Sequence, residues 1–167
     1  MKGITGSNNR FADRSSVNAK DEWLTPPELI KSLGEFDLDS CAPVNRPWPT
    51  AKHHYTIEDD GLIQKWFGRV WCNPPYGNNT KTWLRCMRNH NNGIALIFAR
   101  TETKMFFDYI WNDAVALYFI KGRLKFYNVD GTQGKNTAGA PSVLVAYGEN
   151  NIDCFKNCIY DGKLVIL

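Results

Sequence analysis

At 167 residues, the chain fits one domain that can bury most of its apolar surface without disulfides or a structural metal. Hydrophobic residues make up 43% and charged residues 22%, which excludes an intrinsically disordered protein, and the net charge of +3 permits an acidic partner such as nucleic acid without requiring one. No apolar run approaches the roughly 20 residues that a bilayer demands, so we expect no membrane segment. The five cysteines are scattered without a C-x-x-C pair, which indicates reduced thiols in a cytoplasmic protein and neither a disulfide framework nor a metal site.

The first twenty residues have little apolar periodicity and a basic tilt. We therefore expect a flexible basic arm over 1–20, followed by a single domain over 21–167. The alternative is a disordered terminus without a role. The positive residues of the arm are Lys2, Arg10, Arg14 and Lys20.

Two short apolar strands are predicted to end in proline-rich loops. The first covers 36–39 and is followed by a loop that reaches residue 49. The second covers 70–72 and stops at 73–77, because two consecutive prolines cannot continue a central strand.

The remaining elements follow from apolar spacing and from capping residues. Thr25 before two prolines predicts the N-cap of a short helix, and helical spacing predicts further helices over 82–88 and after Thr101 or Thr103. Asp161-Gly162 predicts a hairpin at the C-terminus. Apolar runs predict strands over 93–99, 114–120, 124–127 and 142–147.

The order of these elements predicts an α/β fold. Strands alternating with helices favour an open, mostly parallel sheet, with an antiparallel strand pair near the C-terminus across the loop at 128–140. Ligands bind such sheets outside the carboxyl ends of the strands. The loops at 39–49 and 73–80 are therefore the expected site.

The sequence Asn73-Pro74-Pro75-Tyr76 indicates a specific chemistry. The prolines remove two backbone donors and stiffen the loop, so it presents carbonyl oxygens together with the amide oxygen of Asn73. Two acceptors that hold the hydrogens of an aromatic amine release its lone pair toward an electrophile. Tyr76 offers a flat face for stacking a base taken out of a helix. The alternative is a proline turn that merely ends a strand.

Several further segments occur in a fixed order around this loop. They are Glu22-Trp23-Leu24-Thr25-Pro26, Asp37-Leu38-Asp39-Ser40-Cys41-Ala42, Asp60-Gly61-Leu62 with Trp66, Ala99-Arg100-Thr101-Glu102-Thr103 and Phe119-Ile120-Lys121-Gly122-Arg123-Leu124-Lys125-Phe126. From residue 23 to about residue 147, the chain resembles the phage-type DNA N6-adenine methyltransferases, a compact branch of the Rossmann-like class I methyltransferases. The resemblance implies S-adenosylmethionine as cofactor, double-stranded DNA as partner and a phage or prophage origin in a bacterial cytoplasm.

The resemblance also implies a set of cofactor-binding residues. An acidic residue after the first strand can accept from ribose hydroxyls or an ammonium group, although a solvated or capping aspartate is the alternative. The chain lacks the G-x-G of the general methyltransferase pattern, and 43–47 takes its place. The implied set is Trp23, Thr25, Pro26, Asp39, Cys41, Ala42 and Asp60.

Polar and basic residues later in the chain are candidates for DNA contacts. Lys121, Arg123 and Lys125 alternate along an extended segment, which suits phosphate contacts; a charge-protected edge strand is the alternative. In the loop at 128–140, the residues suited to base edges are Gln133, Lys135 and Asn136, unless this is merely a mobile polar loop.

The sequence therefore predicts an enzyme that methylates the N6 amine of adenine at specific DNA sites, in restriction avoidance or in regulation. The Asn-Pro-Pro-Tyr motif also serves related families that methylate cytosine N4, adenine in RNA or a protein glutamine. A non-catalytic nucleic-acid-binding module is a further alternative.

Overall fold

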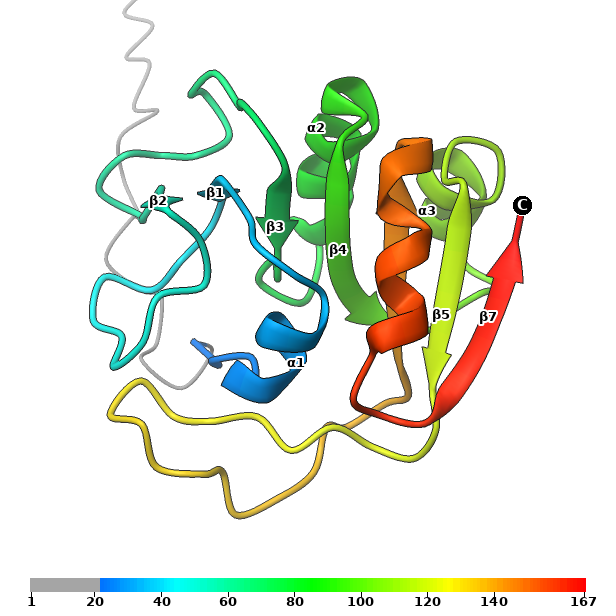
Figure 1. Ribbon diagram of the computed structural model, residues 1–167. Helices are drawn as coiled ribbons and strands as arrows, with labels where there is room; N and C mark the ends of the chain where they lie inside the picture. The colour runs from blue at the N-terminus through cyan, green and yellow to red at the C-terminus, as the bar shows by residue number, and fades with distance from the viewer. Residues whose placement is uncertain (1–21) are drawn as a thin grey trace, which may run out of the picture.

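The computed structural model describes residues 22–167, so the predicted arm at 1–20 lies outside the described residues. Seven strands form one sheet, and helices lie on both of its faces (Figure 1). In chain order the elements are α1 (Pro27–Ser32), β1 (Leu38–Asp39), β2 (His53–His54), β3 (Val70–Cys72), α2 (Thr80–His90), β4 (Gly93–Phe98), α3 (Lys104–Phe106), the π-helix η1 (Phe107–Trp111), β5 (Ala116–Ile120), β6 (Ser142–Tyr147), the 3-10 helices η2 (Glu149–Asn151) and η3 (Asp153–Asn157), and β7 (Gly162–Ile166).

The strands lie in the order β2-β1-β3-β4-β6-β5-β7. The pairs β1–β2, β1–β3 and β3–β4 are parallel, whereas β6 is antiparallel to β4 and β5, and β7 is antiparallel to β5. The sheet is thus mixed and partly parallel: β1 to β5 run in one direction, and β6 and β7 run in the other. The reason is that the chain passes from β5 into β6 through a loop without a helix, which places a reversed strand between β4 and β5. The predicted antiparallel pair near the C-terminus is confirmed as β5–β6.

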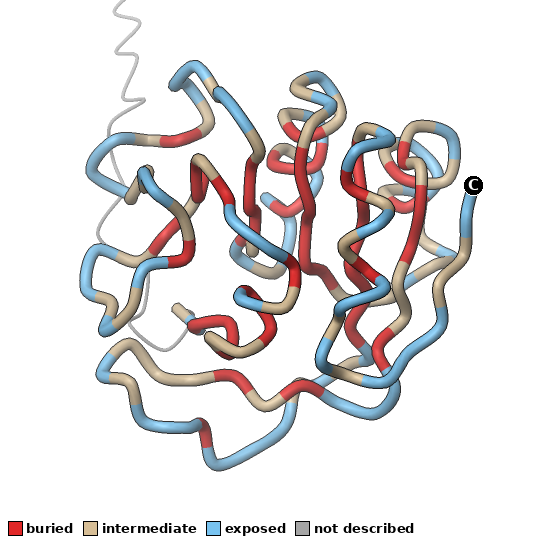
Figure 2. The backbone as a smooth tube through the Cα atoms, in the orientation of Figure 1, coloured by how far each residue is buried: buried red, intermediate tan, exposed pale blue. Residues whose placement is uncertain are grey.

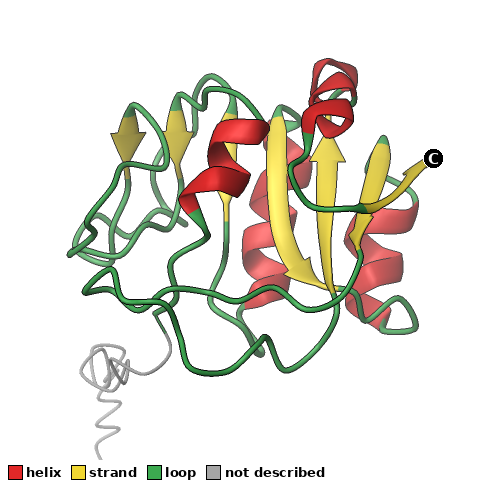
Figure 3. Ribbon diagram, turned by 60° about the horizontal axis from the view of Figure 1, so that its bottom comes forward, coloured by secondary structure: helices red, strands yellow, loops and turns green. Residues whose placement is uncertain are grey.

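The central strands are buried on both faces, as their apolar sequences predict (Figure 2). Helix α2 and the α3–η1 segment cover one face, and α1 with η2 and η3 covers the other (Figure 3). Alternate side chains of one strand enter the two cores, so that Ile97 packs under α2 and Leu96 packs under α1. The strands β3, β4 and β5 end at the lower edge in Figure 1, where the loop at 121–141 also runs.

Helix α1 begins later than predicted. Its N-cap is Pro26, with φ −51° and ψ 127°, and Pro27 takes the first helical position. The prediction that Thr25 caps the helix is wrong, because Pro26 precedes another proline, is therefore held in an extended conformation and cannot be the first helical residue. The Thr25 Oγ1 atom is instead buried without a hydrogen-bond partner.

The predicted strand over 124–127 and the predicted hairpin around Asp161-Gly162 are also wrong. Residues 124–127 leave the sheet after a turn at Gly122 (φ +81°), and only Tyr127 forms isolated bridges, to Leu24 and Gln133. Around Asp161-Gly162 there is no local hairpin, since 153–157 is the 3-10 helix η3 and β7 pairs with β5. A side chain at Gly162 would overlap β5, so glycine here permits close strand approach rather than a turn.

The other predicted elements are confirmed with small shifts. The strands at 70–72 and 142–147 have the predicted bounds, and the strand predicted over 93–99 ends one residue earlier. Helix α2 is longer than predicted at both ends. Thr103 caps α3 by accepting from the Phe106 N–H, but the turn that follows is π-helical.

Candidate active site

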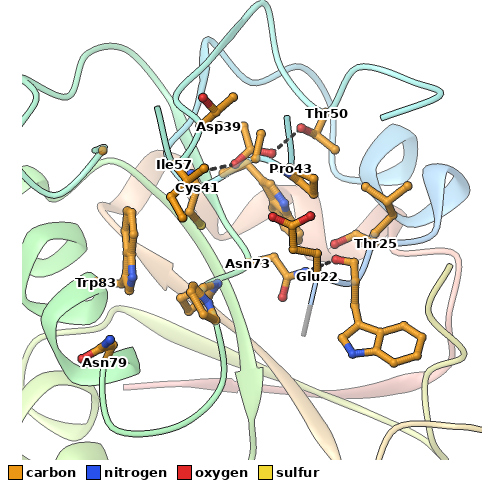
Figure 4. A pocket seen from close by; sticks show the side chains of 18 of the residues that line it. Glu22, Thr25, Asp39, Cys41, Pro43, Thr50, Ile57, Asn73, Asn79 and Trp83 are labelled. Carbon is orange, nitrogen blue, oxygen red and sulfur yellow. Dashed lines mark hydrogen bonds between the residues drawn. The ribbon is translucent and has the colours of Figure 1, made fainter. Parts of the chain in front are cut away.

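Two loops meet at one edge of the sheet because β1 and β3 are parallel neighbours. The chain leaves β1 after Asp39 and β3 after Cys72, so both loops project from the carboxyl ends of the strands. Between these loops and the segment at 22–25 lies a cavity of about 320 Å³ (Figure 4).

Asn73 lies at the wall of this cavity with its amide held in one orientation. The two prolines end β3, and the Thr80 Oγ1 donates to the carbonyl of Pro75 at 2.8 Å, which ties the loop to the start of α2. The Asn73 Nδ2 donates to the backbone carbonyl of Trp23 at 3.2 Å. Its Oδ1 accepts from the Tyr76 hydroxyl at 3.5 Å, and the second lone pair of this oxygen can accept a hydrogen bond from a ligand.

The ring of Tyr76 is a flat aromatic surface that packs against two neighbouring aromatic rings. The ring stacks on Phe98 with centroids 4.0 Å apart and planes 8° apart, and Phe126 packs edge-on with its centroid 6.4 Å from that of Tyr76. Burial raises the pKa of the Tyr76 phenol, so the side chain is neutral. Because Phe98 covers one face of the ring, a base can stack only on the opposite face.

Asp39 places a carboxylate in the wall opposite the proline loop. The side chain is buried, accepts from the Thr50 hydroxyl and accepts from the Cys41 backbone N–H at 3.1 Å. Burial raises the pKa of Asp39 to about 6, although both hydrogen bonds oppose the shift. The neighbouring Cys72 thiol and burial raise the pKa of Cys41, which is thus a neutral thiol rather than a nucleophile.

His54 supports this wall from the next strand, β2. Its Nε2 accepts from the backbone N–H groups of Thr50 at 3.2 Å and Ala51 at 3.3 Å. Burial lowers the pKa of His54 to about 4, with the charge of Arg46 adding to the shift. The neutral imidazole thereby fixes Thr50 against Asp39.

The turn at 56–62 closes a further side of the cavity. Asp60 lines it with a backbone φ of +56°, an uncommon conformation for a residue with a side chain. Gly61 lies directly against the loop that follows β1, and its carbonyl accepts from the Trp66 Nε1 at 2.8 Å. The Asp-Gly sequence therefore reflects close backbone packing.

Replacing Gly61 by alanine is expected to weaken ligand binding in the cavity. The added Cβ would overlap the carbonyl oxygen of Ser40, a backbone atom that cannot rotate away. The turn must then shift, which destabilises the fold by about 1–3 kcal/mol. Ligand affinity by calorimetry and thermal unfolding measure the effect, with Gly139→Ala as control because its Cβ meets no atom within 4 Å. Unchanged affinity in Gly61→Ala would contradict this role of the turn.

The charged side chains that line the cavity are all acidic. They belong to Glu22, Asp39 and Asp60, and no lysine, arginine or histidine among residues 22–167 lines it. The buried Thr25 Oγ1, without a partner, is also part of the lining. The cavity thus favours a positively charged ligand that offers Thr25 a polar group.

The structure brings the predicted catalytic and cofactor residues together, with one exception. Asn73, Pro74, Pro75 and Tyr76 line the same cavity as Trp23, Thr25, Asp39, Cys41, Ala42 and Asp60. Pro26 does not line it and is the N-cap of α1. Sequence analysis assigned no role to the other lining residues, which are Glu22, Leu24, Pro43, Thr50, Thr56, Ile57, Gly61, Leu62, Trp71, Asn79 and Trp83. Of these, Glu22, Leu24, Gly61 and Leu62 stood within quoted motifs.

The predicted DNA-contacting residues lie outside the cavity, in the segment at 121–141. Lys121 and Arg123 are exposed on either side of the turn at Gly122, and Lys125 is partly buried, so the three do not lie along one extended segment or edge strand. Arg123 Nη1 donates to the carbonyl of Ala138 at 3.1 Å. In the loop that follows, the side chains of Gln133, Lys135 and Asn136 are exposed.

In the part of the chain that the structure describes, no cluster of three or more histidine, cysteine or acidic residues is placed to hold a metal ion. None of the helices in this part of the chain has the length and apolar character needed to span a bilayer.

Comparison with known families identifies the class of protein. A family model described as DNA N-6-adenine-methyltransferase (Dam) matches residues 13–155, which is most of the chain. No curated protein and no solved structure matches the chain. The class is thus that of the DNA adenine methyltransferases. The chain belongs to the Dam family.

Proposed function

We propose that this protein transfers a methyl group from S-adenosylmethionine to the N6 amine of an adenine flipped out of duplex DNA at specific sites. The observation that carries the proposal is the meeting of the Asn-Pro-Pro-Tyr loop and the Asp39 loop on one cavity. Residues 21–167 would form a single Rossmann-like class I methyltransferase domain. A sheet with helices on both faces and a cavity at its carboxyl edge supports this assignment.

The charge and shape of the cavity fit S-adenosylmethionine. This cofactor carries a sulfonium, an ammonium and one carboxylate, so its net charge is positive, whereas cofactors with phosphate groups would meet the carboxylates of Glu22, Asp39 and Asp60. The unpartnered hydroxyl of Thr25 can donate to the cofactor's carboxylate. Apolar walls for the adenosine half come from Ile57, Leu62 and Trp83.

The proline loop would prepare the amine. The Asn73 Oδ1 and the backbone carbonyl of Pro74 accept the two N6 hydrogens, which localises the nitrogen lone pair, while the free face of Tyr76 stacks the base. When bound, the cofactor would supply an electrophilic methyl group, and its C–S electron pair would stay on sulfur as the N–C bond forms. The residues of the loop would hold the amine so that its lone pair faces that carbon, and one N6 proton would leave to water. Neither a covalent enzyme intermediate nor a cysteine nucleophile takes part.

The DNA would lie along the edge that carries the loop at 121–141. Lys121, Arg123 and Lys125 would contact phosphates, and their loss should weaken binding to all sequences alike. Gln133, Lys135 and Asn136 would contact base edges and so set the site preference.

The test measures methyl transfer from labelled S-adenosylmethionine to duplex DNA, RNA and protein, followed by nucleoside analysis. We expect the label in N6-methyladenine from DNA. Label in N4-methylcytosine, RNA or a glutamine would overturn the proposed substrate. Titration calorimetry with the cofactor is the second arm, and the absence of saturable heat would overturn the proposal in favour of a non-catalytic binding module.

A further inference from the structure

The orientation of the Asn73 amide decides whether the proposed chemistry works. Its oxygen attracts the hydrogens of an amine, whereas its NH₂ group, turned toward the substrate, would repel them. The carbonyl of Trp23 accepts from Nδ2 at 3.2 Å and favours the productive orientation, which the longer bond of 3.5 Å from the Tyr76 hydroxyl to Oδ1 also supports (Figure 4). A backbone group fifty positions away in the sequence thus helps to orient the catalytic acceptor.

The segment that carries this carbonyl is fastened to a distant loop. Leu24 and Tyr127 exchange two backbone hydrogen bonds, of 2.8 and 3.0 Å. The Gly134 N–H donates to the carbonyl of Phe126 at 2.8 Å, which closes the loop. A Cβ at Gly134 would lie 2.8 Å from that backbone oxygen and 3.3 Å from the Trp23 indole, so a side chain here would force the loop to shift next to Trp23.

The outer side of the same loop faces solvent. Thr132 and Gln133 are exposed, next to Lys135 and Asn136. Side-chain hydrogen bonds hold the tip of this loop together: the Thr132 Oγ1 donates to Asp130 at 2.6 Å and accepts from Asn128 at 2.9 Å. A continuous path of hydrogen bonds and packing therefore joins an exposed polar loop to the amide of Asn73.

We propose that residues 23 and 24 form a positioning strap, which couples the loop at 126–136 to the orientation of the Asn73 amide. Trp23 is then a positioning residue, and DNA held by the loop keeps the catalytic acceptor in place. This inference rests on the proposed function. It requires that the integrity of the loop controls the rate of methyl transfer more than the affinity for cofactor.

Gly134→Ala tests the strap, with Gly139→Ala as the matched control three residues beyond the loop, where a Cβ meets no atom within 4 Å. Under single-turnover conditions with excess enzyme, Gly134→Ala should lower the transfer rate about 10- to 100-fold, the scale expected when a catalytic group is displaced. Its loss of S-adenosylmethionine affinity should be much smaller, and Gly139→Ala should match the wild type. Equal rates in the two variants would overturn the strap.

An Asn73→Asp background separates positioning from general damage. Both oxygens of aspartate accept, so neither orientation needs the Trp23 carbonyl, and Gly134→Ala should then cost much less in rate. The same fold-loss in both backgrounds would overturn the inference. If Gly134→Ala does not fold, Thr132→Val replaces it in both backgrounds, with a smaller loss of the same pattern expected. An inactive wild type would instead overturn the proposed function itself.

Discussion

Replacing Asn73 by alanine is expected to lower the rate of methyl transfer by about 10²- to 10³-fold, the usual effect of removing one preorganised group that stabilises a transition state. The substitution deletes the Oδ1 acceptor but leaves the carbonyl of Pro74 and the Tyr76 ring in place. Affinity for S-adenosylmethionine should change far less, because the carboxylates of the cavity remain. Single-turnover transfer to duplex DNA and calorimetry with the cofactor measure the two effects.

The matched control is Asn78→Ala. Asn78 is exposed and does not line the cavity, so the same chemical change there should leave the rate at the wild-type value. Mapping of methylated adenines in DNA from expressing cells gives a second readout. An equal methylation signal with and without the Asn73 side chain would rule out its role as acceptor.

Replacing Asp39 by asparagine is expected to have opposite effects on stability and binding. A carboxylate whose pKa is raised by burial to about 6 destabilises the ligand-free protein at neutral pH, by about 3 kcal/mol relative to an exposed aspartate. Asparagine removes that charge and can still accept from the Cys41 N–H and donate to the Thr50 hydroxyl. The variant should unfold at a higher temperature yet bind S-adenosylmethionine more weakly.

The pH dependence follows from the same raised pKa. The folded protein holds the Asp39 proton more tightly than the unfolded chain, whose value is 3.8, so this group makes stability fall as pH rises from about 4 to about 6. Cofactor affinity should rise through the same window, because the cationic ligand needs the ionised carboxylate. Thermal unfolding and calorimetry between pH 4 and 8 measure both, with the exposed Asp153→Asn as control. The account fails if Asp39→Asn loses stability and binds like the wild type.

The local part of the site could be predicted from the sequence because its signals are short in range. Two prolines after an apolar strand show where that strand ends, and so they place Asn73 at its carboxyl end. Asp39 is placed in the same way, because it stands at the end of another short strand. The rule that ligands bind outside strand ends then predicts that the two loops meet. The cavity confirms that they do, although the roles of the residues in it stay predictions.

The parts that sequence analysis missed depend on contacts between distant segments. Thr50 reaches Asp39 only because His54 holds its loop, and the carbonyl of Trp23 reaches Asn73 only after Leu24 is tied to Tyr127. Strand direction is likewise set by the route of the chain after β5 rather than by the composition of β6. Capping was mispredicted at Thr25 because two prolines in succession move the helix start.

The charged side chains that line the cavity are all acidic, and this affects the release of the by-product in each turnover. In the proposed reaction, the sulfonium charge disappears when the methyl group leaves, and the spent molecule retains only a balanced ammonium and carboxylate. The three carboxylates then attract by-product less than fresh donor. After each cycle the cavity therefore favours exchange of by-product for fresh donor, and by-product inhibition should be weakest at a pH above the raised pKa of Asp39.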